Sequence, residues 1–237
     1  INTEETFTDS STTTTSWKAL REAETLSNPA FYPILKKIIL INPKPKDKKI
    51  RDAAYFILGK LLKNEPLDEQ ICFYLQQLEV ETDKYILSGM LDRIADIKIP
   101  SDISVKPIVR LAMNEKWLIR HSAIRALGAS ATLESKQALA YYINQEDVKR
   151  YKYEITYANA ALGEIGSVED IPLLEQHINN RISDVRGSAV FAIERIQARI
   201  KWAFNVVRLI GKRRTCIDGE IAKPAEPVNG QDERRIS

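Results

Sequence analysis

The apolar residues of the chain recur at the spacing of a repeated pair of helices. An apolar residue, often followed by Arg, marks the start of one helix in each pair. The starts are spaced by 36, 33, 35 and 31 residues, at Ile50, Ile86, Ile119, Glu154 with Ile155, and Val185. Eight residues after each start lies a second apolar anchor, at Leu58, Ile94, Leu127, Leu162 and Ile193. Repeats of this length are typical of proteins built from stacked helical units.

Within one unit, the apolar positions follow the period of an α-helix. Ile119, Ala123, Ala126 and Leu127 share one helical face. The second helices follow the same rule, with apolar faces at Ile171, Leu174 and Ile178, and at Leu139, Tyr142 and Ile143. Because no single hairpin can bury its apolar face alone, neighbouring hairpins must stack to form the core. We therefore predict an all-α fold.

The clearest hairpin sequence runs over residues 161–174, ALGEIGSVEDIPLL. A helix ends at a Gly pair, an acidic turn follows, and a second helix opens on Ile-Pro-Leu-Leu. This stretch resembles HEAT repeats, in the variant found in phycobilisome-lyase-type proteins. The resemblance implies a right-handed α-solenoid of about five to six helical hairpins.

Charged residues recur at the starts of the first helices. Asp is a good N-cap because its side chain accepts hydrogen bonds from free backbone amides, and three residues are placed for this role: Asp47, Asp83 and Asp184. In HEAT proteins such Asp residues form a ladder with Arg residues of adjacent repeats. The resemblance implies the same for Arg51, Arg120 and Arg186. Ile155 stands where the fourth Arg would be, so the ladder should break there.

Composition divides the chain into four segments. Residues 1–15 form a polar segment for which no structure is expected, and residues 16–200 form the repeat domain, with a divergent first hairpin over 16–42. Residues 201–210 are apolar and predict a capping helix, or else an amphipathic segment that docks on a partner or a membrane. Residues 211–237 form a polar tail.

Two features bear on where the protein works. There is no apolar run long enough for a transmembrane helix. The two cysteines, Cys72 and Cys216, lie far apart and form no CxxC motif, and Cys72 is expected in the core. These features favour a reducing compartment, so we expect a cytoplasmic protein.

The sequence holds few residues suited to catalysis. Its two histidines, His121 and His177, have no second His at metal-ligand spacing, and no phosphate loop or nucleophile motif occurs. The His-Glu pairs of HEAT-type di-iron hydroxylases are missing as well. We expect a protein that is not an enzyme and has no metal or cofactor.

Two basic segments favour nucleic acid as an alternative ligand. One cluster holds Lys44, Lys46, Lys48 and Lys49, followed by Arg51. The other, residues 149–153, alternates basic and aromatic side chains as a phosphate-binding and stacking surface does. The net charge is only +3, from 35 basic and 32 acidic residues, which also fits ordinary solvated loops.

In HEAT solenoids the second helices line the concave side, and this side usually takes the ligand. We align these helices on Leu35, Leu75, Ile108, Leu139 and Leu174. The alignment places one outward row at Lys37, Gln77, Arg110, Tyr141 and Gln176. A neighbouring row holds Leu40, Val80, Met113, Asn144 and Asn179.

Cations, amides, Tyr and apolar side chains in such rows suit a protein segment better than a small metabolite. The predicted binding residues are Lys37, Gln77, Arg110, Tyr141, Asn144, Gln176 and Asn179. We therefore expect an adaptor or scaffold that binds a partner protein. A lyase-like role in handling phycobilin is a further alternative, although the resemblance covers only the generic repeat.

Overall fold

The computed structural model describes residues 14–220, with side chains as far as residue 203. All regular structure in this range is helical, without a strand. Short 3₁₀ turns accompany the α-helices, which are α1 (Thr15–Glu24), α2 (Tyr32–Ile41), α3 (Lys48–Asn64), α4 (Asp68–Val80), α5 (Lys84–Ile94), α6 (Lys106–Ala112), α7 (Trp117–Ala126), α8 (Leu133–Ile143), α9 (Lys152–Ile165), α10 (Ile171–Glu175) and α11 (Ser183–Glu220). The predicted all-α class is confirmed.

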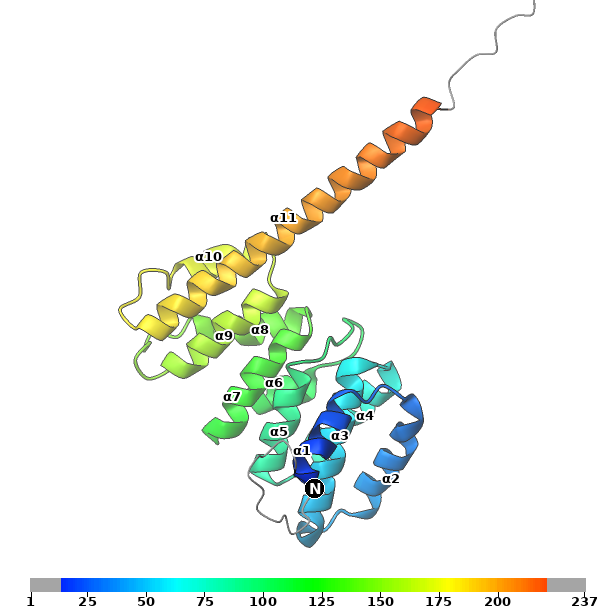
Figure 1. Cartoon of the computed structure of the whole chain (residues 1–237). Coiled ribbons are helices and arrows are strands. Elements are labelled where there is room, and N and C mark those ends of the chain that lie inside the picture. Colours follow the sequence, from blue (N-terminus) through cyan, green and yellow to red (C-terminus); the bar gives the residue numbers. More distant parts are fainter. Residues whose placement is uncertain (1–13, 221–237) are drawn as a thin grey trace, which may run out of the picture. The chain divides into compact units, whose positions relative to one another are not determined.

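The helices of residues 14–196 pack in two series. The odd-numbered helices follow one another in space, α3 on α5, α5 on α7 and α7 on α9. The even-numbered helices do the same, α4 on α6, α6 on α8 and α8 on α10. Contacts such as α2 on α3, α6 on α7 and α8 on α9 join the two series (Figure 1).

The anchors predicted from the repeat form much of the core. Leu58, Ile94, Leu127 and Leu162 are at most 1% exposed, and Ile193 is partly buried against them. The anchors of the second helices are buried as well: Leu35, Leu75, Ile108, Leu139 and Leu174. Sequence spacing therefore identified the buried face of each helix.

Small residues on this face allow the odd-numbered helices to approach closely. A Cβ atom added to Gly163 in α9 would lie 2.9 Å from Ala192 Cα in α11. Gly128, just after α7, lies against Ala161 of α9 in the same way. Side-chain bonds reinforce the α9–α11 contact, since Asn159 Nδ2 donates to Ser188 Oγ over 3.1 Å.

Three positions that we expected in the core are exposed. One is Ile178, which lies beyond the end of α10 and is 36% exposed. Ile50 is 50% exposed and lies in an apolar groove between α2 and α3. Cys72 is exposed on the outward side of α4, whose buried face carries Ile71, Leu75 and Leu78. The expectation of a core cysteine was wrong.

The C-terminal helix does not break at the boundaries predicted at residues 200 and 210. α11 runs from Ser183 to Glu220. No proline occurs between Pro172 and Pro224, so nothing in this stretch removes a backbone donor from the helix. The chain divides into two compact units between Ile196 and Gln197, inside α11. The rest of the predicted tail, residues 221–237, and residues 1–13 of the predicted polar segment lie outside the described range.

Candidate functional site

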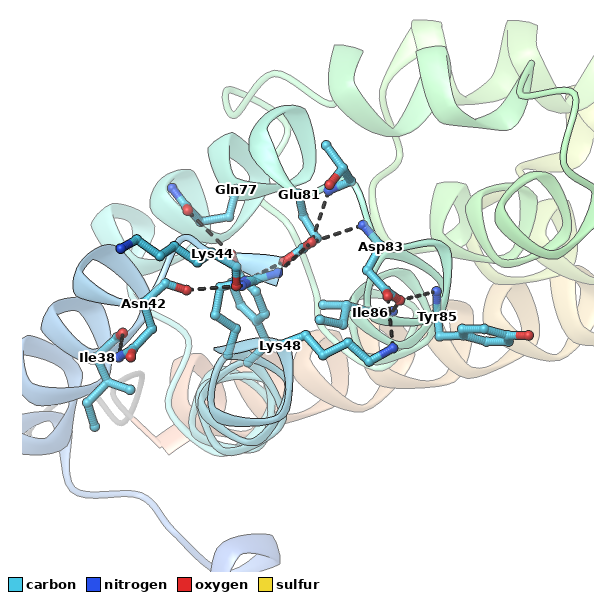
Figure 2. Close-up of polar contacts among 12 residues, drawn as sticks. Ile38, Asn42, Lys44, Lys48, Gln77, Glu81, Asp83, Tyr85 and Ile86 are labelled. Atoms are coloured by element: carbon cyan, nitrogen blue, oxygen red, sulfur yellow. Dashed lines mark hydrogen bonds and ion pairs between the residues drawn. The ribbon is translucent and has the colours of Figure 1, made fainter. Parts of the chain in front are cut away.

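A buried ion pair joins the start of α3 to the residue directly after α4. Arg51 Nε and Nη2 donate to the two carboxylate oxygens of Glu81, over 2.9 and 3.1 Å. The remaining terminal nitrogen, Nη1, donates to the backbone carbonyls of Asn42 and Lys44. Glu81 also accepts from the backbone amides of Thr82 and Asp83 (Figure 2). The pair thus ties three segments of backbone together.

This network changes the predicted Asp–Arg ladder. The arginines bond glutamates, Arg51 to Glu81 directly after α4 of its own hairpin and Arg120 to Glu154 in α9 of the next hairpin. Arg186 instead donates to the carbonyl of Asn180. Glutamate takes this role because its longer side chain reaches the arginine from the end of α4 or the start of α9.

The three aspartates also differ from one another. Asp83 caps α5, accepting from the amides of Tyr85 and Ile86, and pairs with Lys48 of the preceding hairpin over 3.0 Å. Asp47 makes no side-chain cap, and Asp184 lies inside the first turn of α11. One of the three expected N-caps is therefore confirmed.

The basic cluster at residues 44–49 is partly absorbed into this framework. The ammonium of Lys48 points toward Asp83, and the carbonyl of Lys44 accepts from Arg51 (Figure 2). The side chains of Lys44, Lys46 and Lys49 are exposed, and among the described residues none of them forms an ion pair. Of the four lysines in the predicted basic patch, these three therefore have solvent-exposed side chains.

The predicted row on the second helices is mostly exposed. Lys37, Arg110, Tyr141 and Gln176 face solvent, and so do Asn144 and Asn179. Gln77 is an exception, since it is buried in α4 and its Oε1 accepts from the Tyr55 hydroxyl over 3.4 Å. Its placement in an outward row was wrong, because the sequence does not show that Tyr55 lies opposite and needs an acceptor.

Contacts between successive even-numbered helices connect the exposed row. Arg110 Nη1 pairs with Glu79 of α4 over 2.9 Å. Gln176 Nε2 donates to Asn144 Oδ1 over 3.2 Å. Gln176 and Asn179 also line a cavity of about 600 Å³ between the α8–α9 and α10–α11 connections.

Three exposed apolar side chains lie in the neighbouring row and form a strip together with Tyr141 of this row. We define the apolar strip as Leu40, Val80, Met113 and Tyr141, which are 55%, 69%, 47% and 52% exposed. They lie on or directly after α2, α4, α6 and α8. The Tyr142 hydroxyl contacts Met113 Sδ over 3.5 Å and Tyr142 packs edge-on against Tyr141, so the last two strip residues flank one side chain. The strip is a surface suited to contact with another apolar surface.

A second candidate site is an aromatic pocket between the N-terminal halves of α7 and α9. The rings of Trp117, Tyr153 and Tyr157 surround His121, with centroids 5.6, 6.0 and 5.3 Å from that of the imidazole. The cavity has a volume of about 450 Å³ and is lined by Trp117, Arg120, His121, Arg150, Tyr153, Glu154 and Tyr157.

A buried carboxylate organises the base of this pocket. Glu154 Oε1 lies 2.7 Å from Arg120 Nη2 and 3.2 Å from His121 Nε2. Burial raises the pKa of the Glu154 carboxyl, but the hydrogen bonds from Arg120 and His121 outweigh it and hold that pKa below its ordinary value. Glu154 is therefore a paired anion that positions Arg120 and His121.

Sequence reasoning found only part of this pocket. The basic and aromatic segment at residues 149–153 was identified, whereas His121 was considered alone, and Trp117 and Tyr157 were not considered. A signal was present, because Trp117 with His121 and Tyr153 with Tyr157 are both spaced i, i+4, and side chains at that spacing share a helix face.

Neither site has the groups of a metal centre. Within the described part of the chain, no cluster of three or more His, Cys, Asp or Glu side chains could hold a metal ion. No helix in the same part is both long and apolar enough to cross a membrane. The two sites present apolar side chains, aromatic rings and charged groups.

No protein-family model matches the chain, and no curated protein is significantly similar to it.

Proposed function

We propose that the chain is a non-enzymatic adaptor that binds a partner protein along its even-numbered helices. In this proposal the hairpins form a right-handed solenoid of HEAT-like repeats, and α2, α4, α6, α8 and α10 line its binding side. The repeat spacing and the successive packing of the two helix series support the solenoid.

The apolar strip carries the proposal for binding. Leu40, Val80 and Met113 each lie five residues after a buried anchor of their own helix, so three hairpins present an apolar side chain at one equivalent position. Burying such a side chain contributes about 1.5–3 kcal/mol. A few anchors of this kind can supply most of the binding energy of a protein interface.

Charge indicates which partner segment fits beside the strip. Lys37 and Arg110 are the charged members of the predicted row, and both are cations. Arg110 also forms an ion pair with Glu79. The amides of Asn144 and Gln176 add adaptable hydrogen-bonding groups. We infer a neutral to acidic protein segment that carries apolar anchors.

The test compares two double variants that remove the same side-chain types. Val80→Ser with Tyr141→Ser removes half of the strip, and Val168→Ser with Tyr85→Ser removes a Val and a Tyr of similar exposure elsewhere. In nuclease-treated pull-downs from native extract, we expect a protein captured by the wild type and the control but about tenfold less by the strip variant, equivalent to about 1.4 kcal/mol.

All three proteins should keep the same circular dichroism and melting temperature, because the exchanged side chains are exposed. Equal capture by the strip variant and the control would refute binding at the strip. Capture that disappears with nuclease would refute a protein partner.

A further inference from the structure

The aromatic pocket between α7 and α9 is separate from the apolar strip, and the adaptor proposal does not use it. The rings and charges of the pocket come mainly from α7 and α9, two successive odd-numbered helices. Arg120 and Glu154, which are bonded to each other across the pocket, are 34 residues apart in sequence. A volume of about 450 Å³ lies within the range of small-molecule sites, about 300–1,000 Å³. The pocket can therefore accommodate a planar ring with a substituent.

Two aromatic rings of the pocket are exposed to solvent and are not part of the hydrophobic core. Trp117 is 63% exposed and Tyr153 is 50% exposed. The Trp117 and Tyr153 rings are tilted against His121 by 55° and 48°, and Lys152 Nζ lies over the Tyr153 ring, so Trp117 is the better platform for stacking. Exposed aromatic rings in this arrangement are stacking platforms for flat ligands.

The charges around the rings favour an anion over a cation. Among the lining residues, Glu154 is matched by Arg120, which leaves the guanidinium of Arg150 as a net positive charge. Arg150 Cζ lies over the Tyr151 ring, 5.2 Å from its centre, and Lys152 Nζ lies 4.6 Å from the centre of the Tyr153 ring. A quaternary ammonium ligand would need the opposite balance, with an unpaired carboxylate beside the rings.

We propose that this pocket binds a nucleobase together with its phosphate. The base stacks on Trp117, which is the more exposed ring, and the phosphate is held by Arg150 with Lys152 nearby. Two sources carry this chemistry, a free nucleotide and a single strand of nucleic acid.

The test measures binding of two probes to the full chain: a fluorescently labelled 12-nucleotide oligouridylate, by anisotropy, and uridine monophosphate, by calorimetry. Trp117→Ala is expected to weaken binding about tenfold, as loss of a stacking platform does. Trp17→Ala is the matched control, since Trp17 of α1 is 37% exposed and is not among the residues that line the pocket, and the affinity of this variant should stay within about twofold of the wild type.

A second pair of variants tests the phosphate contact. Arg150→Gln should reduce the salt dependence of oligonucleotide binding by one phosphate contact, a change of about 0.7 in the slope of log K against log salt. Arg125→Gln removes an exposed arginine that pairs with Asp92, and it should leave the slope unchanged.

Tighter binding of the oligonucleotide than of the mononucleotide would support a single strand as the source, and equal binding per site would support a free nucleotide. Failure of both probes to bind would overturn the proposal. So would binding that Trp117→Ala leaves intact, or binding of tetramethylammonium in place of nucleotide.

Discussion

Arg51→Ala is expected to lower the free energy of unfolding by about 3–5 kcal/mol, because it leaves a buried carboxylate without its partner. The side chains of Arg51 and Glu81 are only 8% and 2% exposed. The substitution also removes the donor to the carbonyls of Asn42 and Lys44. Urea unfolding followed by circular dichroism measures the change.

The matched control is Arg125→Ala. Arg125 pairs with Asp92 over 2.8 Å, with side chains 48% and 42% exposed, so the change should cost at most about 1 kcal/mol. If Arg51→Ala cost no more than Arg125→Ala, the buried pair would not stabilise the fold as described.

The pH dependence of this effect has a definite sign. Burial raises the pKa of Glu81, but the hydrogen bonds from Arg51 and from the amides of Asp83 and Thr82 bring it below its ordinary value of 4.5. A lowered carboxyl pKa stabilises the fold above the ordinary value, and this contribution is lost as the pH falls through the lowered pKa. The difference between wild type and Arg51→Ala should therefore be largest near neutral pH and shrink below pH 4.5.

Gly163→Ala and Gly187→Ala are expected to change stability in opposite directions. At Gly163 the new Cβ would lie 2.9 Å from Ala192 Cα and 3.0 Å from Ala192 Cβ, so α9 and α11 must separate, at a cost of about 1–3 kcal/mol. At Gly187 in α11 no atom lies within 4 Å of the added Cβ, and Ala should stabilise the helix by about 0.5–1 kcal/mol.

Melting temperatures of the two variants test this contrast directly. Both substitutions replace a helical Gly with Ala, so the change in helix propensity is the same. The two sites differ in whether a neighbouring helix lies against the added Cβ. A stabilising effect of Gly163→Ala would contradict the close approach of α9 and α11.

Periodicity predicted the fold class because it reports which face of a helix is apolar. Leu58, Leu127 and Leu162 were assigned to the core from spacing alone, and each is fully buried. The α11 helix continues past the predicted boundaries at residues 200 and 210, and no proline occurs between Pro172 and Pro224 to interrupt it.

What lies opposite a side chain could not be predicted in the same way. Gln77 is buried because Tyr55 lies opposite it. Arg51 bonds Glu81 and not an aspartate, because α4 ends directly before Glu81. The aromatic pocket depends on α7 and α9 meeting, with Trp117 and Tyr153 on either side of His121. These features depend on how two helices pack against each other, and the apolar pattern of one helix does not report that packing.

The central claim is that a partner protein binds along the even-numbered helices, and site-specific photo-crosslinking tests it most directly. A photoreactive phenylalanine analogue at Met113 or Tyr141 samples the apolar strip, whereas the same analogue at Tyr85 of α5 samples an odd-numbered helix with an exposed side chain. We predict that the analogue at position 113 or 141 crosslinks to one and the same protein in native extract. The analogue at position 85 should not crosslink to that protein. Crosslinking of that protein from position 85 alone, or none from positions 113 and 141, would contradict it.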